Sequence, residues 1–285
     1  MRRRSPEELY QEGRRLDLLG HEARSVPFYE EAAEAGHGPA CNELGKQRIR
    51  SGRTIEGLHL LRKAVAAGVP EAWLNLAAVH TRRGQTAKAD ECRAGAEPLL
   101  RELAGTGDLT AALGLRRLYR DRDDRAAADA VVVTAAEHVR TSTDPDTWCG
   151  FGALLDDAGR VAEAVEWWRK GAERGHVESM YLLGLGLHDL RDESAEHWIE
   201  RAARKENAYA MGSLAQLALS RGDERTAEQW LRRAAKAGFS GAMNNLAVLY
   251  KERGDVVAAA RWYTEAGKAG DPNAEYNLQE LESGD

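Results

Sequence analysis

The stretch AMGSLAQLALSRGDERTAEQWLRRAAKAG at residues 210–238 is followed by a second copy of its pattern, AMNNLAVLYKERGDVVAAARWYTEAGKAG, at residues 242–270. Leu214 corresponds to Leu246 and Trp230 to Trp262, and every match lies 32 residues from its counterpart. A fixed period of this length indicates a repeat protein, in which each unit packs only on its neighbours. The repeat therefore predicts the architecture and the general mode of action, and it leaves the partner open.

The same pattern extends over most of the chain. In each unit a small residue in the first helix is followed, seven positions later, by a residue that ends that helix. This residue is usually a glycine, which permits the left-handed conformation at a helix end, whereas Asp121 and Arg191 take its place in two units. The small residues are Gly13, Gly45, Ala77, Gly114, Gly152, Gly184, Ala215 and Ala247.

A bulky pair recurs in the second helix of the regular units, as in Trp167-Trp168 and Trp262-Tyr263. Pairs at this spacing are expected to fill the core between units rather than to stack on a ligand. At these positions the chain resembles the tetratricopeptide repeat family, and more narrowly its Sel-one-like branch. The residues that carry the resemblance best are Ala242, Leu246, Ala247, Tyr250, Gly254, Ala259, Trp262, Ala266 and Gly270.

The resemblance covers most of the chain and implies an all-α, right-handed α-solenoid of about eight helix-turn-helix repeats with a C-terminal capping helix. We predict a single solenoid over residues 1–285, with regular repeats at 5–87 and 144–271, lengthened repeats at 88–143 and the capping helix at 272–282.

The lengthened repeats flank Gly114, where the spacing of the small residues rises to 37 and 38. We expect Pro98 to interrupt the first of the two long second helices. The bulky pair is replaced there by Cys92-Arg93 and then by Asp129-Ala130. Two interpretations stay open, namely two irregular repeats, or a bend or self-association surface through which the chain forms a homodimer.

Composition narrows the class of protein. The net charge is −6, which does not suggest a nucleic-acid surface, and no segment approaches the ~18 apolar residues of a membrane span. Cys41, Cys92 and Cys149 show no CxxC spacing, so we expect free thiols in a reducing compartment. We therefore expect a cytoplasmic protein that binds neither nucleic acid nor membrane.

One group of side chains suggests chemistry. His188, Asp189, Glu193 and His197 straddle the break at Arg191, and two histidines with a carboxylate could bind zinc. A metal-dependent hydrolase that uses His188 and His197 is therefore the competing interpretation. Because their spacing matches no recognised ligand pattern and no P-loop, GxSxG or HExxH motif occurs, we expect no enzyme, no cofactor and no metal.

The resemblance implies instead a non-catalytic adaptor that binds a protein or peptide segment in a concave groove lined by first helices. The lining positions lie three before and one, four and five after each small residue. Their charge is basic early and acidic near the middle, so a bound segment is expected to take one orientation. The predicted groove residues are Arg14, Asn42, Lys46, Arg50, Arg82, Asp156, Asp157, His188, Asp189, Gln216, Asn244 and Lys251.

Overall fold

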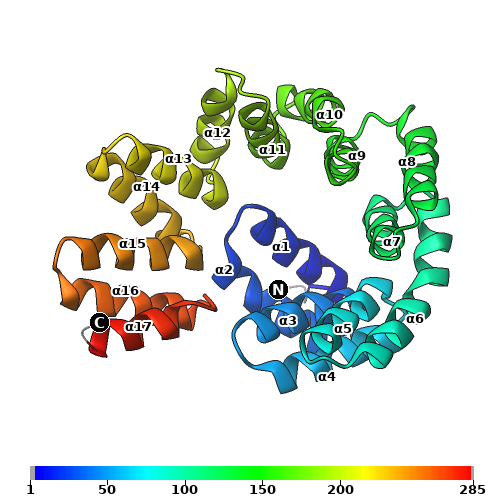
Figure 1. Ribbon diagram of the computed structural model, residues 1–285, viewed down its shortest axis with the longest axis horizontal. Helices are drawn as coiled ribbons and strands as arrows, with labels where there is room; N and C mark the ends of the chain where they lie inside the picture. The colour runs from blue at the N-terminus through cyan, green and yellow to red at the C-terminus, as the bar shows by residue number, and fades with distance from the viewer. Residues whose placement is uncertain (1–3, 284–285) are drawn as a thin grey trace. The chain divides into compact units, whose positions relative to one another are not determined.

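The structure, a computed structural model, describes residues 4–283. Residues 1–3 and 284–285, which the predicted solenoid includes, lie outside the described residues. Within the described range the chain forms seventeen α-helices and no strand (Figure 1). The predicted all-α fold is therefore confirmed.

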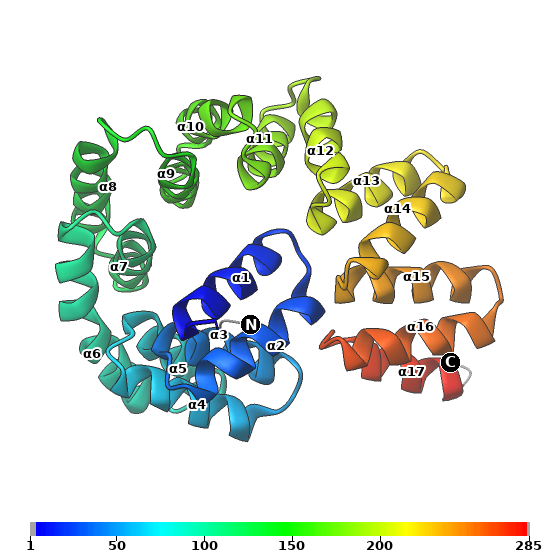
Figure 2. The ribbon, with the colours of Figure 1, turned by 180° about the vertical axis from the view of Figure 1, so that it is seen from behind.

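The helices follow one another as eight helix pairs and one final helix. The first helices of the pairs are α1 (Pro6–Leu18), α3 (Gly38–Arg50), α5 (Pro70–Arg82), α7 (Leu109–Asp121), α9 (Pro145–Asp157), α11 (Val177–Asp189), α13 (Ala208–Ser220) and α15 (Ser240–Glu252). The second helices are α2 (Glu22–Glu34), α4 (Thr54–Ala66), α6 (Thr86–Gly105), α8 (Arg125–Val139), α10 (Val161–Glu173), α12 (Ala195–Arg204), α14 (Glu224–Lys236) and α16 (Val256–Lys268). The final helix, α17 (Ala274–Ser283), packs against α16 (Figure 2).

The turns within the pairs form for the reason that the sequence suggests. Gly222 and Gly254 adopt φ values of 75° and 77°, which an L-residue rarely tolerates, and each ends a first helix. The next residue caps the second helix: Asp223 accepts a hydrogen bond from the backbone N–H of Thr226 at 3.0 Å, and Asp255 caps α16 in the same way. Both turns therefore combine a left-handed glycine with an acidic N-cap.

In α1 and α9 the small residue makes room for the second member of the bulky pair. A Cβ atom on Gly152 would lie 2.6 Å from Cδ1 of Trp168, and one on Gly13 would lie 2.7 Å from Cε1 of Tyr29. Trp168 and Tyr29 are themselves buried. The prediction that the bulky pairs belong to the core is therefore confirmed for the second member of these pairs.

The register of the fourth repeat was predicted wrongly. All eight first helices have thirteen residues, and the predicted small residue is the eighth one in seven of them. In α7 the eighth residue is Arg116, not Gly114. The left-handed residue that follows α7 is Asp123 at φ 57°, not Asp121. The spacings on either side of Arg116 are therefore 39 and 36 residues.

The same shift of two residues moves the bulky pair of the fourth repeat. The position of the bulky pair in α8 is occupied by Val131-Val132 and not by Asp129-Ala130, and both valines are buried. The expectation for Pro98 was also wrong, because α6 continues through this residue for 20 residues in all. The lengthening of the third repeat lies in its second helix as predicted, since α6 has 20 residues, whereas that of the fourth is divided between α8, with 15 residues, and the connection at residues 140–144.

The chain divides into two compact units. The terminal unit combines the residues up to Leu60 with those from Ile199 onward, and the middle unit comprises residues 61–198. A single continuous solenoid stays a prediction.

Within the terminal unit, the turn between α1 and α2 packs against two turns that lie far along the chain. The backbone N–H of Ala208 donates to the carbonyl of Leu19 at 2.7 Å, and that of Ala23 donates to the carbonyl of Gly238 at 3.3 Å. The side chain of Asn207 donates to the carbonyl of Leu18 at 3.3 Å. We call this contact the terminal junction.

Two neighbouring side chains, His21 and Glu22, reinforce the terminal junction. The Nε2 atom of His21 lies 2.8 Å from the carbonyl oxygen of Glu206. The carboxylate of Glu22 accepts hydrogen bonds from the hydroxyls of Tyr209 at 3.3 Å and Ser240 at 3.2 Å. His21 is 5% exposed, so the junction excludes water from a titratable group.

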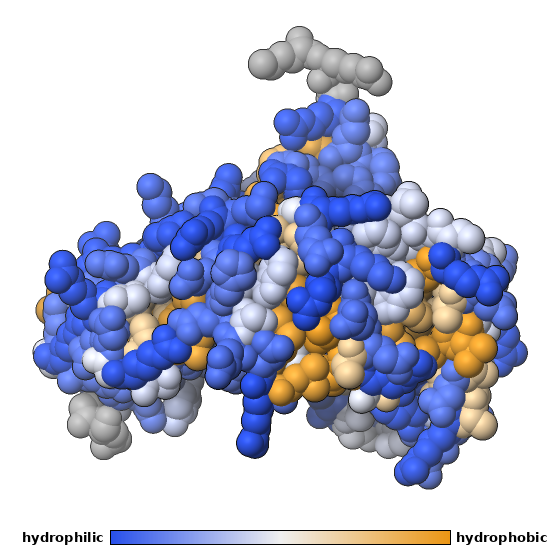
Figure 3. Space-filling model, turned by 90° about the horizontal axis from the view of Figure 1, so that it is seen from above, coloured by the Kyte–Doolittle hydropathy of each residue, from blue (hydrophilic) through white to orange (hydrophobic). Residues whose placement is uncertain are grey.

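The visible surface is mostly hydrophilic, with smaller hydrophobic patches between the charged side chains (Figure 3). Among residues 4–283, none of the helices combines the length and the apolar character needed to cross a bilayer.

Candidate interaction site

All twelve predicted groove residues lie on first helices, but they are distributed over the two units. The terminal unit carries Arg14 on α1, Asn42, Lys46 and Arg50 on α3, Gln216 on α13, and Asn244 and Lys251 on α15. The middle unit carries Arg82 on α5, Asp156 and Asp157 on α9, and His188 and Asp189 on α11. Each unit therefore carries part of the predicted set.

Part of the set in the terminal unit is engaged inside the protein. Asn42 is only 4% exposed, and its amide donates to Glu43 at 3.1 Å. Asn244 accepts a hydrogen bond from Asn277 of α17 at 2.9 Å, and the ammonium group of Lys251 lies 3.7 Å from a carboxylate oxygen on the same helix. The final helix therefore covers the positions of α15 that were expected to face a partner.

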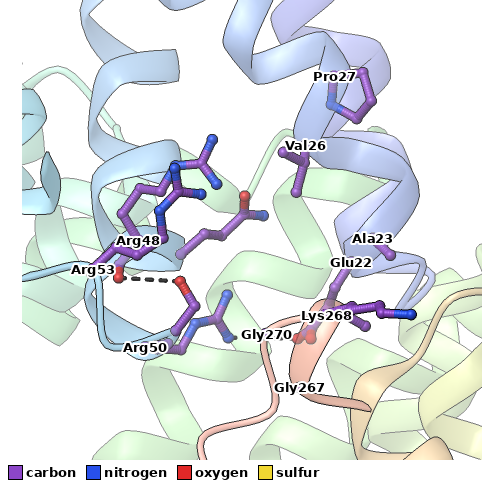
Figure 4. Close-up of a pocket in the computed structure, with 13 residues that line it drawn as sticks. Glu22, Ala23, Val26, Pro27, Arg48, Arg50, Arg53, Gly267, Lys268 and Gly270 are labelled. Atoms are coloured by element: carbon purple, nitrogen blue, oxygen red, sulfur yellow. Dashed lines mark hydrogen bonds and ion pairs between the residues drawn. The ribbon is translucent and has the colours of Figure 1, made fainter. Parts of the chain in front are cut away.

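Arg50 lines a pocket of about 310 Å³ in the terminal unit, together with Arg48, Arg53 and Lys268 (Figure 4). Each of these cations already has a carboxylate neighbour. Arg50 lies 3.4 Å from Glu22, and the lysine ammonium lies 2.9 Å from Glu265. The ion pairs of Arg48 and Arg53 are formed with carboxylates at positions 30 and 56. Basic side chains therefore line the pocket, but the carboxylates paired with them bring the local net charge close to zero.

The middle unit holds a cluster that the sequence analysis did not find. Three arginines of α7 converge on the carboxylate of Asp157, at the end of α9. Arg116 Nη1 donates to the backbone carbonyl of Asp157 at 2.6 Å and also to its carboxylate. Arg117 Nε and Arg120 Nη1 donate to Oδ1 of the same carboxylate at 2.9 and 3.1 Å. We call these four residues the α7–α9 cluster.

The cluster determines the charge state of Asp157. Burial alone would raise the pKa of this carboxyl group, but the hydrogen bond from Arg117 and the charges of Arg117, Arg120 and Arg116 together lower it. Asp157 is therefore ionised and paired. The expectation that it offers a free acid to a partner is not supported by these contacts.

The neighbouring Asp156 behaves in the opposite way. Its pKa is raised by partial burial, then by the negative charge of Asp189 on α11, and then by that of Asp157. Asp156 and Asp189 are exposed side chains on adjacent first helices. The middle unit thus places an acidic pair beside a group of arginines.

The register error explains why the arginines were missed. If the groove positions of α7 are counted from Arg116, its eighth residue, the positions one and four residues later are Arg117 and Arg120. Counting from Gly114 gave Leu115 and Leu118, which are buried at 4% and 2% exposure. The signal that could have found the arginines is Asp124, which caps α8 and thereby marks the end of the preceding turn.

The histidine group does not form a metal site in the described range. No set of three or more His, Cys, Asp or Glu side chains between residues 4 and 283 is arranged to hold a metal ion. His188 is exposed at the end of α11, whereas His197 lies beside the ring of Trp198, with 5.8 Å between the ring centroids. The geometry therefore gives no support to the competing hydrolase interpretation.

Comparison with known proteins concerns the fold. Neither the protein-family models nor the curated proteins include a match to this chain. Among solved structures, c5321, a protective antigen present in uropathogenic Escherichia coli strains displaying an SLR fold, is 23% identical with a TM-score of 0.44. The alignment covers 97% of this chain but only 64% of that protein, which is less than two thirds of its length.

Two further solved structures are similar. A Sel1 repeat protein from Oxalobacter formigenes is 19% identical with a TM-score of 0.41, and the alignment covers 99% of this chain and 95% of that one. A tetratricopeptide repeat protein from Parabacteroides merdae is 16% identical with a TM-score of 0.47, with 86% and 98% covered. These proteins carry the repeat names that the sequence pattern resembles.

Proposed function

We propose that this chain is a non-catalytic adaptor that binds a segment of a partner protein along the exposed face of its first helices. The observation that carries the proposal is a set of exposed polar side chains on these helices that have no partner among the described residues. Arg14 and Gln216 occupy the ninth position of α1 and α13 in the terminal unit, and Arg82 and His188 lie near the ends of α5 and α11 in the middle unit. None of the four side chains forms a hydrogen bond or ion pair with another residue between 4 and 283.

The physical reason is that an exposed, unpaired side chain contributes little to folding but remains available for binding. In repeat proteins each unit contacts only its neighbours, so corresponding positions of successive first helices form an extended surface. Long charged side chains on such a surface set the register and the rate of association more than the affinity. Binding is therefore expected to weaken as the salt concentration rises.

We place the adaptor in the cytoplasm. Cys41, Cys92 and Cys149 are buried, and no disulfide joins any two of them. Free thiols persist in a reducing compartment, whereas secreted proteins usually form disulfides.

An affinity pulldown with mass spectrometry tests the proposal. The wild-type chain serves as bait beside an Arg14→Glu/Arg82→Glu variant, which reverses one charge on a first helix of each unit. The matched control, Arg62→Glu/Arg261→Glu, reverses two exposed arginines on the second helices α4 and α16. We expect the first variant to lose its captured proteins while keeping its helical circular dichroism signal, and the control to keep both.

The opposite pattern, loss of capture in the second-helix control alone, would place the binding surface on the second helices and overturn the proposal. Capture of a second copy of this chain alone would support the self-association that the lengthened repeats suggested, and it would also overturn the adaptor.

A further inference from the structure

The α7–α9 cluster contains more positive charge than its own carboxylate can neutralise. Three guanidinium groups face one carboxylate, and Arg116 alone provides the buried ion pair, with 8% of its side chain exposed. The side chains of Arg117 and Arg120 are 54% and 52% exposed. Solvent screens the outer faces of these two guanidinium groups, although the carboxylate that they share is only 9% exposed. Arg117 and Arg120 therefore keep an exposed face beside the buried pair of Arg116 and Asp157.

The hydrogen-bonding capacity of the arginines is also only partly used. Each guanidinium carries five N–H donors, but Arg117 uses only Nε and Arg120 only Nη1 within the described residues. Arg116, which is 7% exposed as a residue, has a buried Nε with no acceptor. Free donors of Arg117 and Arg120 thus surround a carboxylate that cannot satisfy them all.

We propose that Arg117 and Arg120 bind a carboxylate of an acidic side chain in the partner segment. This inference rests on the proposed function and names the chemistry of the partner at one position. A guanidinium matches a carboxylate with two parallel N–H···O bonds, which are stronger than hydrogen bonds between neutral groups. Both arginines already donate to one carboxylate, that of Asp157, and each keeps further N–H donors for a second one.

The surroundings favour a carboxylate over a phosphate. Asp157 lies within the cluster, and the charge of Asp189 already raises the pKa of Asp156 beside it. A phosphate group carries nearly two negative charges at neutral pH and would meet these three carboxylates at close range. A single carboxylate meets less repulsion, and a basic residue of the same segment can pair with Asp156 and Asp189. The partner segment therefore places an acidic residue over α7 and a basic residue over α9 and α11.

Nuclear magnetic resonance of the full chain tests the inference with two probes at matched ionic strength, a hexaglutamate peptide and inorganic phosphate. The readout is the Nε–Hε resonances of Arg117 and Arg120 and the dissociation constant obtained from them and from the backbone amides of α7. We expect the peptide to shift both side-chain resonances. An Arg117→Gln/Arg120→Gln variant should bind the peptide at least about tenfold more weakly, because it loses two charge-assisted contacts.

The control variant is Arg62→Gln/Arg125→Gln, which removes two exposed arginines from second helices and should leave peptide binding unchanged. If the double variant of α7 loses helical signal, Arg120→Gln alone replaces it, because Arg116 and Arg117 then still hold Asp157. Equal weakening of peptide binding in both variants would show that only the net charge of the protein matters, and it would overturn the inference. Shifts with phosphate and none with the peptide would assign the site to a phosphate group and also overturn it.

The pulldown separates this inference from the proposed function. A partner that is lost in the Arg14→Glu/Arg82→Glu variant but retained by Arg117→Gln/Arg120→Gln would leave the adaptor intact and overturn the assignment of the α7 arginines.

Discussion

At the scale of single residues, close packing surrounds the small residue of two first helices, α1 and α9. Gly152 and Gly13 have no room for a Cβ because an aromatic ring of the second helix occupies that space. Arg116 shows the complementary solution, because the residue 16 positions later is Val132 rather than an aromatic residue. In α7 a side chain larger than alanine thus lies opposite a partner smaller than an aromatic ring.

A double-mutant cycle tests this complementarity. Gly152→Ala should destabilise the protein by about 1–3 kcal/mol, the usual cost of overpacking a core. In a Trp168→Val background the same change should cost much less, because the ring that it strikes is gone. Urea unfolding of the four proteins measures the coupling. Equal costs in both backgrounds would show that the glycine is required for a reason other than the ring.

Leu246 tests the core of the C-terminal repeats. It is 0% exposed, so Leu246→Ala should lower the free energy of unfolding by ~2–5 kcal/mol through lost burial and the remaining cavity. Val257→Ala is the matched control, because Val257 is 83% exposed and lies in the same unit. Denaturant titration should show a shift for the first variant and almost none for the second. Identical midpoints for Leu246→Ala and the wild type would contradict the assigned register.

At the scale of elements, the terminal junction ties the turn between α1 and α2 to two later turns, and its buried His21 makes it sensitive to pH. Arg24 Nη1 lies 3.4 Å from Nδ1 of His21, which assigns Nδ1 as the acceptor and Nε2–H as the donor to the Glu206 carbonyl. Burial lowers the pKa of His21. The hydrogen bond to the Glu206 carbonyl and the Glu206 carboxylate oppose this effect, and Arg24 and Arg15 add to it. The junction therefore favours the neutral imidazole.

The sign of the pH dependence follows from that preference. With a pKa lowered in the closed junction, the contribution of His21 is complete above its usual value of about 6.5 and is lost as the pH falls toward the lowered value. Hydrogen exchange of the Ala208 and Ala23 amides, corrected for intrinsic rates, measures the opening directly, because both donate across the junction. We expect their protection to fall below about pH 6.5, by at most about tenfold per pH unit.

His21→Gln is the informative variant, because the amide keeps a donor for the Glu206 carbonyl without titrating. Its protection should be nearly independent of pH in this range. His188→Gln, at an exposed position of the middle unit, should behave like the wild type. A pH response that persists in His21→Gln would attribute the effect to another group.

At the scale of the whole molecule, the chain spreads its titratable residues over many first helices and concentrates none of them into a metal-binding set in residues 4–283. We expect the purified protein to contain less than one zinc per chain by elemental analysis. One metal per chain that disappears in a His188→Ala/His197→Ala variant would instead favour the hydrolase interpretation. The measurement uses the intact chain, so it also covers the residues outside the described range.

The sequence by itself determined the helical repeats, most of the helix ends and the positions whose side chains pack in the core. These features depend on residues within one turn or one helix pair, such as the left-handed Gly254 and its neighbouring cap Asp255, and they recur every 32 residues. The register of the fourth repeat was missed because Gly114 resembles the small residue of the other units. Only the helix ends showed that Arg116 occupies that position.

The tertiary structure alone decided which residues meet over long distances. Asp157 pairs with arginines 37 to 41 positions earlier, and His21 meets a backbone carbonyl 185 positions later. Neither contact has a periodic signal, because carbonyl groups occur at every residue and an exposed arginine looks the same in sequence whether or not it is paired. Local patterns report the side chains that a helix buries, whereas the surplus of charge at the α7–α9 cluster depends on how two helices are brought together.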